Sequence, residues 1–306
     1  MLTIYYKNIK ENTLRVLEEF KVGSWIHVES PSEAEIKEIT TRYNLDEGIL
    51  RDATDFYEVP RIEVEQTVTY IFTRYPISKN DRIFTAPLLI IVAEDFFMTI
   101  TQRRFNLIDR FTAGEIDFFT TQKTKLFLQL FFQIYTSYNQ FLSNISRDIR
   151  RTRVQVENIN NKDIVQFIVF EEVLNDFLSA LIPTRASLRN LLSGKFLKLY
   201  KDDEDLVEDL FLNKGQLIEM CTANLRTIVN IREAYSAIMT HDLNKVIKLL
   251  TALTIIFSVP TMVASLYGMN VILPFSQSPF AFVGVVIFII LISVALVGVF
   301  IKNKWL

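Results

Sequence analysis

The chain has 306 residues, half of them hydrophobic, and its 33 basic and 35 acidic side chains leave a net charge of −2. This balance gives no reason to expect nucleic-acid binding. The charges are unevenly placed, being dense through residues 1–248 and absent from Leu249 to Ile301. So long an uncharged run argues against a soluble protein and predicts an integral membrane protein.

Residues 1–116 predict a mixed α/β domain. Runs rich in β-branched and aromatic residues, such as LTIYY and SWIHVES, predict strands, with a hairpin turn at residues 94–95 and breaks at Pro60, Pro76 and Pro87. No signal peptide precedes these runs, so we expect this domain to stay in the cytoplasm.

Residues 117–248 predict a stalk of long helices, because Gly and Pro are rare and apolar residues recur at helical spacing. One helix begins near the start of this region, and a second covers about 163–192. A third begins in the acidic segment KDDEDLVEDL (201–210) and meets few helix breakers before Pro260. The third helix therefore couples the cytoplasmic domain to the membrane.

Residues 249–306 predict a membrane domain of two spans, near 249–269 and 280–301. Each is close to the roughly 20 residues that one helix needs to cross a bilayer. Lysines flank both spans, at positions 245, 248, 302 and 304. By the positive-inside rule we expect both termini in the cytoplasm of a multi-pass cell-membrane protein.

The first span carries hydroxyl groups on one face. At about 100° per residue they fall within an arc of roughly 80°, with Ile247 at its centre and Asn244 at its edge. A wetted stripe, or packing against another helix, would explain the alignment. Because two helices cannot enclose water, a wetted stripe requires several copies around an axis. The hydroxyl-bearing residues are Thr251, Thr254, Ser258, Thr261 and Ser265.

The first span ends on Gly268-Met269-Asn270 without a charged residue. A ring of asparagine amide oxygens would attract a hydrated cation, and Mg²⁺ usually keeps several of its waters when bound. We expect Gly268 to permit a tight turn that aims the amide inward. These residues therefore predict the mouth of a cation pore.

Other chemistry finds little support in the sequence. His27, His241 and Cys221 are too scattered to suggest a zinc site. No nucleophile elbow, metal-ligand cluster or GxxxxGK[ST] phosphate loop occurs, so we expect neither an enzyme nor a nucleotide partner.

The segment LNKVIKLLTALTIIFSVPTMVASLYGMN (243–270), the two C-terminal spans and the basic end KNKWL resemble the CorA family of divalent-cation transporters. The resemblance implies a homopentamer with an α/β cytoplasmic domain, long stalk helices and a pore lined by the first span. It implies transport of Mg²⁺, with Co²⁺ and Ni²⁺ as further candidates.

The resemblance also assigns roles to residues. Asn270 would form the selectivity ring, and Asn244, Ile247, Leu250 and Thr261 would line the pore, with Ile247 and Leu250 at a hydrophobic gate. Asp209 would bind a regulatory divalent cation, Mg²⁺ included, between subunits. Two alternatives stay open: a zinc transporter of the same fold, and a non-conducting membrane-anchored sensor or scaffold for divalent ions.

Overall fold

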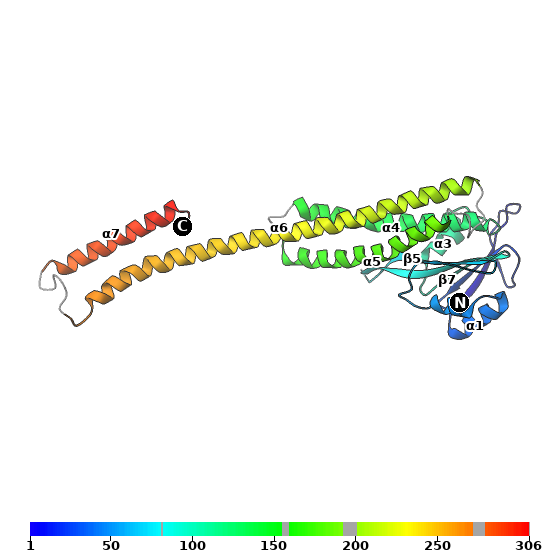
Figure 1. Cartoon of the computed structure of the whole chain (residues 1–306), viewed down its shortest axis with the longest axis horizontal. Helices are drawn as coiled ribbons and strands as arrows, with labels where there is room; N and C mark the ends of the chain where they lie inside the picture. The colour runs from blue at the N-terminus through cyan, green and yellow to red at the C-terminus, as the bar shows by residue number, and fades with distance from the viewer. Residues whose placement is uncertain (81, 155–158, 192–200, 272–278, 306) are drawn as a thin grey trace. The chain divides into compact units, whose positions relative to one another are not determined.

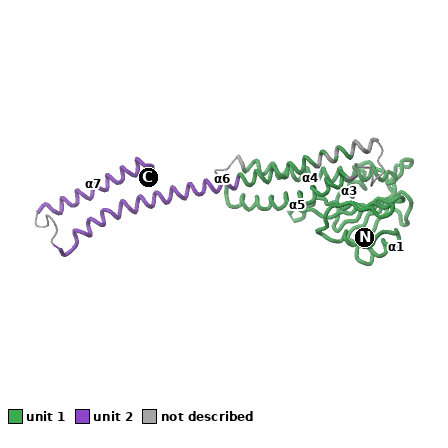
Figure 2. The backbone as a smooth tube through the Cα atoms, viewed as in Figure 1, with its two compact units in different colours: residues 1–230 green, residues 231–306 purple. Residues whose placement is uncertain are grey.

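The computed structural model describes residues 1–80, 82–154, 159–191, 201–271 and 279–305. The chain divides into two compact units, residues 1–230 and 231–306 (Figure 2). The third predicted helix is α6 (Lys201–Tyr267), and it is shared between the two units. The predicted division into three domains, with boundaries after residues 116 and 248, stays a prediction.

Unit 1 is built on one seven-stranded sheet in the order β2-β1-β3-β7-β6-β5-β4. Strands β3 and β7 are parallel, and every other neighbouring pair is antiparallel. The turn predicted at 94–95 is confirmed, since it joins β6 to β7. The strands are β1 (Leu2–Tyr6), β2 (Arg15–Leu17), β3 (Ser24–Glu29), β4 (Ile62–Glu65), β5 (Val68–Lys79), β6 (Arg82–Val92) and β7 (Phe96–Thr101).

Helices cover both faces of the sheet (Figure 1). Helices α1 (Glu33–Tyr43) and α2 (Glu47–Asp52) bury Ile36, Ile39 and Leu50 in a core that also contains strand residues. Helices α3 (Asn106–Thr112), α4 (Lys123–Val154) and α5 (Asn161–Leu191) lie on the other side, where α4 contacts β5 and α5 contacts β5 and β6. Unit 1 is therefore a three-layer α/β structure.

Strand β3 has buried apolar side chains on both faces of the sheet, so helices must pack on both faces. Ile26 and Val28 belong to the core beside α1 and α2. Trp25, on the opposite face because strand side chains alternate, packs edge-to-face on Phe111 and Phe118. The indole Nε1–H of Trp25 donates to Thr99 Oγ1 at 3.0 Å, so the polar atom of this fully buried ring is satisfied.

Two prolines predicted as strand breaks lie inside strands, so that prediction is wrong. Pro76 is part of β5 and Pro87 part of β6, and both positions are paired in the register of the two strands. The β4 ladder ends opposite Ile71 and the β7 ladder opposite Leu88, so at each proline the strand has one partner only. Proline is tolerated there because its missing N–H can face an open edge.

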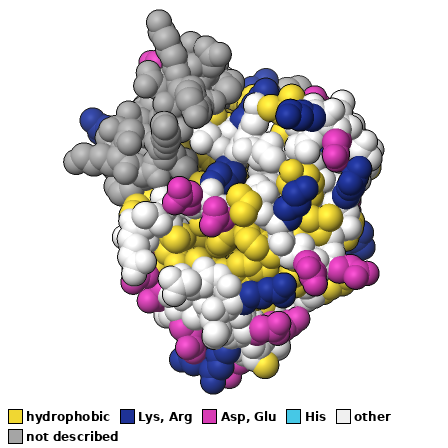
Figure 3. Space-filling view, turned by 90° about the vertical axis from the view of Figure 1, so that its right-hand side faces the viewer, with side chains coloured by type: hydrophobic (Ala, Val, Ile, Leu, Met, Phe, Trp, Pro, Cys, Tyr) yellow, Lys and Arg dark blue, Asp and Glu magenta, His cyan; other side chains and the backbone are white. Residues whose placement is uncertain are grey.

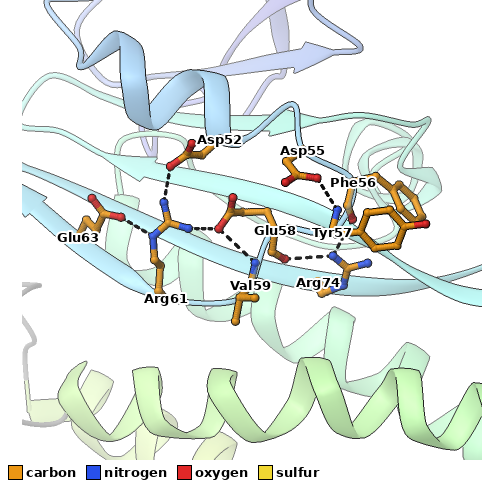
Figure 4. Close-up of polar contacts among 9 residues, drawn as sticks. All are labelled: Asp52, Asp55, Phe56, Tyr57, Glu58, Val59, Arg61, Glu63 and Arg74. Atoms are coloured by element: carbon orange, nitrogen blue, oxygen red, sulfur yellow. Dashed lines mark hydrogen bonds and ion pairs between the residues drawn. The ribbon is translucent and has the colours of Figure 1, made fainter.

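Two arginines fasten the connection from α2 to β4 onto the sheet (Figure 4). Arg61 pairs with Asp52 at 2.7 Å and with Glu58 and Glu63, and it lies over the ring of Phe72. Arg74 is buried in β5 and donates to the carbonyls of Phe56 (2.8 Å), Glu58 (3.0 Å) and Thr85 (2.9 Å).

Figure 3 shows one face of unit 1. Acidic and basic side chains lie interspersed among hydrophobic ones. Neither sign of charge dominates there, which agrees with the net charge of −2.

Unit 2 contains the C-terminal part of α6 and all of α7 (Ala281–Lys302), which form an antiparallel pair (Figure 2). Both helices are long and apolar enough to cross a membrane. The N-terminal α/β unit, the long helices and the two apolar C-terminal helices confirm the predicted fold class for the single chain.

We expect Arg74→Met to lower the free energy of unfolding by about 3 kcal/mol, because buried carbonyls lose a charged donor. The measurement is denaturant unfolding of the detergent-solubilised chain, followed by tryptophan fluorescence in a Trp305→Phe background where Trp25 is the remaining tryptophan. The control is Arg15→Met, which removes an exposed arginine paired with Glu11 and should cost less than about 0.5 kcal/mol. Equal losses in the two variants would contradict the role given to Arg74.

Candidate cation pathway

The eight residues predicted to line a pore lie on α6, and all are exposed in the single chain. Ile247 and Leu250, the two large apolar members, are 50% and 58% exposed. The structure thus leaves the predicted stripe free of contact with α7. Its members are Asn244, Ile247, Leu250, Thr251, Thr254, Ser258, Thr261 and Ser265.

A different face of α6 packs on α7. Ala252 is fully buried, and the partly covered residues Ile255, Val259 and Val263 follow it at helical spacing. On α7 the buried or partly covered positions recur with the same period, from Ala281 through Val285 to Phe300. Packing within the chain therefore does not account for the hydroxyl alignment. Packing against another copy and a wetted stripe both stay open.

The threonines of the stripe donate their hydroxyl protons to the helix backbone. Thr251 Oγ1 donates to Ile247 O at 2.8 Å, Thr254 Oγ1 to Leu250 O at 2.8 Å, and Thr261 Oγ1 to Phe257 O at 2.7 Å. Each hydroxyl oxygen keeps its lone pairs as acceptors. An oxygen in this state can accept a hydrogen bond from the water shell of a cation.

Pro260 lies inside α6, partly covered. It has no N–H, so the Ile256 carbonyl loses its helical partner. Ile256 is also partly covered, on the α7 side of the helix. The carbonyl without a helical partner thus lies near the contact between α6 and α7 and away from the centre of the hydroxyl stripe.

Helix α6 ends at Tyr267, directly before Gly268-Met269-Asn270. The Gly268 N–H donates to Ala264 O at 3.0 Å and to Ser265 O at 3.2 Å, which closes the last turn. Met269 and Asn270 are exposed. No hydrogen bond joins the Asn270 side chain to the described part of the chain, so its amide is available to an ion or to another copy.

The expectation that Gly268 permits a tight turn that aims the Asn270 amide inward stays a prediction. Among the described glycines, the left-handed region is occupied by Gly23 and Gly114 and not by Gly268. A Cβ added at Gly268 would meet the carbonyl oxygens of Ala264 and Ser265 at 3.5 Å, an ordinary contact distance. Within one chain, nothing in the backbone at this position demands glycine.

The predicted regulatory residue, Asp209, belongs to the backbone of α6, and its side chain lies outside the described residues. Among the residues that the structure describes, no group of three His, Cys, Asp or Glu side chains is arranged to hold a metal ion.

The softer ligands have separate surroundings. His27 is buried in β3 with Nδ1 2.9 Å from Thr99 Oγ1, and burial lowers the pKa of its imidazole to about 4. Burial raises the pKa of the Cys221 thiol to about 12, so no thiolate is present at neutral pH. His241 is exposed on α6, 3.7 Å from Asp242.

Aromatic residues at the ends of the helix pair were not singled out from the sequence. Trp305 folds back on Phe300 with ring centroids 5.6 Å apart. The backbone N–H of Trp305 donates to the Phe300 carbonyl at 2.9 Å. At the opposite end, Tyr267 and Phe280 line an apolar cavity of about 440 Å³. Aromatic side chains favour membrane interfaces. Trp305 follows the uncharged run, and Tyr267 and Phe280 lie on either side of the break between the two spans, which was the available signal.

The family of the chain follows from comparison with known proteins. The model of the CorA-like Mg²⁺ transporter protein family matches residues 20–302. The chain therefore belongs to this family, and the predicted family resemblance is confirmed.

The chain is similar to the cobalt/magnesium transport protein CorA of Methanocaldococcus jannaschii, with 25% identity over 294 residues that cover 92% of this chain and 91% of the relative. The complete structure of the CorA magnesium transporter from that organism superposes with a TM-score of 0.87 at 21% identity, covering 100% of this chain and 99% of the other.

The cytoplasmic domain of ZntB from Vibrio parahaemolyticus superposes with a TM-score of 0.66 at 10% identity, covering 78% of this chain and 98% of that domain. Likeness at such identities concerns the fold. The fold by itself therefore does not select the ion.

Cysteine substitution would test whether the stripe is wet. We expect Thr254→Cys and Ser258→Cys to react with a charged, water-soluble thiol reagent about tenfold faster than Leu253→Cys, because the thiolate that reacts forms only in contact with water. Leu253 is also exposed, at about 120° from the centre of the stripe. The native Cys221 is buried and should contribute no labelling. Equal rates at all three positions in the assembled protein would contradict a water-lined stripe.

Proposed function

We propose that this protein transports Mg²⁺ across the cell membrane through a homopentameric pore lined by α6. Co²⁺ and Ni²⁺ are further candidate ions. The observation that carries the proposal is the exposed face of α6. On it a hydroxyl stripe leads toward Asn270, whose side chain has no partner among the described residues, and the other side of the helix packs on α7. Membership of the CorA-like family and the activity for which the Methanocaldococcus relative is named support the same function.

Assembly is part of the proposal. Two apolar helices bury one contact face between them and cannot surround water, so the pathway needs several copies about an axis. Five is the number that the family resemblance implies. Both termini would lie in the cytoplasm, where Lys302 and Lys304 satisfy the positive-inside rule.

The membrane potential would drive uptake. A divalent ion moving to the negative side gains about 4.6 kcal/mol per 100 mV. This is enough for inward transport without a nucleotide, and we propose no catalytic role for the chain.

Asn270 would select the ion through its hydration shell. Mg²⁺ loses water reluctantly, and a ring of neutral amide oxygens can accept hydrogen bonds from the waters that it keeps. The threonine oxygens with free lone pairs would continue this contact along the pore. Ile247 and Leu250 would form an apolar constriction, closed by loss of water between the rings of side chains.

Regulation would come from the cytoplasmic side. Divalent ions bridging Asp209 of one subunit to the next would hold the pore closed, and their loss at low internal Mg²⁺ would release it. A zinc transporter remains the alternative of the same class. Against it, His27 and Cys221 are buried and His241 is exposed, and no group of three ligand side chains among the described residues is arranged to hold a metal ion. A non-conducting sensor is the alternative outside transport.

We expect Asn270→Ala to reduce Mg²⁺ influx into liposomes by more than about tenfold, because the ring that holds the hydrated ion is lost. The readout is a trapped Mg²⁺-sensitive dye, with Zn²⁺ influx measured in parallel. The matched control is Asn303→Ala at the other end of the membrane unit, where an asparagine follows α7.

The control should transport at the unmodified rate. Normal influx through assembled Asn270→Ala would contradict the pore-mouth assignment. Zn²⁺ influx exceeding Mg²⁺ influx in the unmodified protein would favour the zinc alternative, and no influx of either ion would favour the sensor.

The Asp209 assignment has its own test. We expect Asp209→Asn to leave initial influx unchanged and to raise several-fold the internal Mg²⁺ needed for half-inhibition, because the neutral amide binds Mg²⁺ more weakly than a carboxylate. Glu208→Gln is the matched control, since it removes a neighbouring exposed carboxylate from the same helix. Unchanged inhibition in Asp209→Asn, or an equal change in both variants, would remove the specific role of Asp209.

A further inference from the structure

Unit 1 contains a cavity of about 780 Å³ at one edge of its sheet. Strands β3, β5 and β7 run in the same direction, so their carboxyl ends point toward this edge. The backbone after β3 and after β7 is joined there, since Ser30 N–H donates to Thr101 O and Ser30 Oγ donates to Gln102 O, each at 2.7 Å. In open α/β sheets, crevices outside the carboxyl ends of strands bind ligands.

The walls come from separate elements. The last β6–β7 pair is Leu88 with Thr101, and Leu88 lies opposite Thr73 of β5. Beyond that point the β5–β6 ribbon continues without β7, and residues 75–79 form one wall. Helices α3 and α4 supply the other, through Arg110 and Gln140 among others. The volume falls in the range of small-molecule sites.

The lining is basic. It contains Lys79, Arg103, Arg104 and Arg110, and no aspartate or glutamate is among the described residues that line it. Arg104 and Arg110 are paired with carboxylates outside the cavity, Asp109 and Glu115, each at 2.9 Å. Lys79 and Arg103 make no ion pair with any described residue.

Arg103 is held in place without a counter-ion. Its guanidinium lies 5.3 Å from the ring centroid of Phe56 and 5.1 Å from that of Phe84, and its carbonyl accepts the hydroxyl proton of Tyr75 at 3.1 Å. A guanidinium packed on aromatic rings keeps its N–H donors for a planar or tetrahedral anion.

The same cavity has an apolar side. Tyr75 and Phe105 pack together with ring centroids 4.2 Å apart and ring planes tilted by 44°, and Phe141 and Ile77 also line the space. A simple inorganic anion would use the cations and leave this surface uncovered. A ligand that uses both sides carries its charge at one end and an apolar or ring-shaped body at the other.

We propose that this cavity binds a small organic phosphate, with the phosphate against Lys79 and Arg103 and the body against the apolar wall. This proposal departs from the expectation of no nucleotide partner, which was based on the absence of a phosphate loop. A ligand here would be held by side chains and would act on unit 1 by binding alone. The proposal is independent of the pore and of Asp209.

The test is equilibrium binding to the purified whole chain in detergent, in metal-free buffer with EDTA so that chelation of Mg²⁺ by the ligand is not measured. The probes are ATP, inorganic pyrophosphate and adenosine, which supply charge with a body, charge alone and a body alone. Lys79→Gln and Arg103→Gln are compared with Lys37→Gln and Arg42→Gln. The latter pair removes the same charges from α1, on the opposite face of the sheet.

We expect saturable binding of one ATP per chain, weaker binding of pyrophosphate and none of adenosine. Each cavity variant should weaken ATP binding by about tenfold, as the loss of a charge-assisted hydrogen bond does, and the α1 variants should bind normally. Lys79 is exposed at the end of a strand, so its variant tests the proposal even if Arg103→Gln unfolds. Absence of saturable ATP binding, or equal weakening in the α1 variants, would overturn the proposal. Pyrophosphate binding as tight as ATP binding would overturn the part given to the apolar wall.

Discussion

The structure of the membrane unit depends on the poor solvation of polar groups in a bilayer. Backbone N–H and C=O groups between Leu249 and Ile301 must find partners within the chain, and charged side chains are excluded. Two helices satisfy this requirement, and they bury a single face between them, around Ala252 and Phe300. The rest of α6, including every hydroxyl of its stripe, stays exposed. What covers or wets that stripe must come from outside the single chain, and for this reason the proposed function is a property of an assembly.

The threonines show how such a stripe is tolerated. By donating to the carbonyl four residues earlier, Thr251, Thr254 and Thr261 satisfy their protons inside the helix. The cost of carrying a hydroxyl into the membrane is thereby reduced. Because each hydroxyl proton points to the helix backbone, none would point toward a cation in the proposed pore. The oxygen lone pairs would stay available to the water around that cation. Bonding to the helix backbone and contact with water are therefore compatible explanations of these hydroxyls.

How much was predictable from the sequence depends on the range of each signal. Some signals are local: the uncharged run, the scarcity of helix breakers before Pro260 and the turn at 94–95. They were enough to predict the two spans, α6 and the β6–β7 hairpin. Pro76 and Pro87 misled because their tolerance depends on where β4 and β7 stop pairing, which is set by register across the sheet. The short elements β2, α2 and α3 gave no periodic pattern. Lys79 and Arg103 meet at one cavity only through strand order, so no spacing in the chain indicates them.

Gly268 marks the limit of what one chain explains. Its backbone lies outside the left-handed region, and an added methyl group would make only ordinary contacts with Ala264 and Ser265. A reason for glycine must therefore lie in the space beside it. Under the proposed assembly, the ends of α6 from neighbouring copies converge where Asn270 faces the axis. A missing side chain two residues before Asn270 would then let the asparagines approach one another closely enough to share one hydrated ion. The Asn270 amide oxygen, which no described residue engages, can then accept hydrogen bonds from the water shell of that ion.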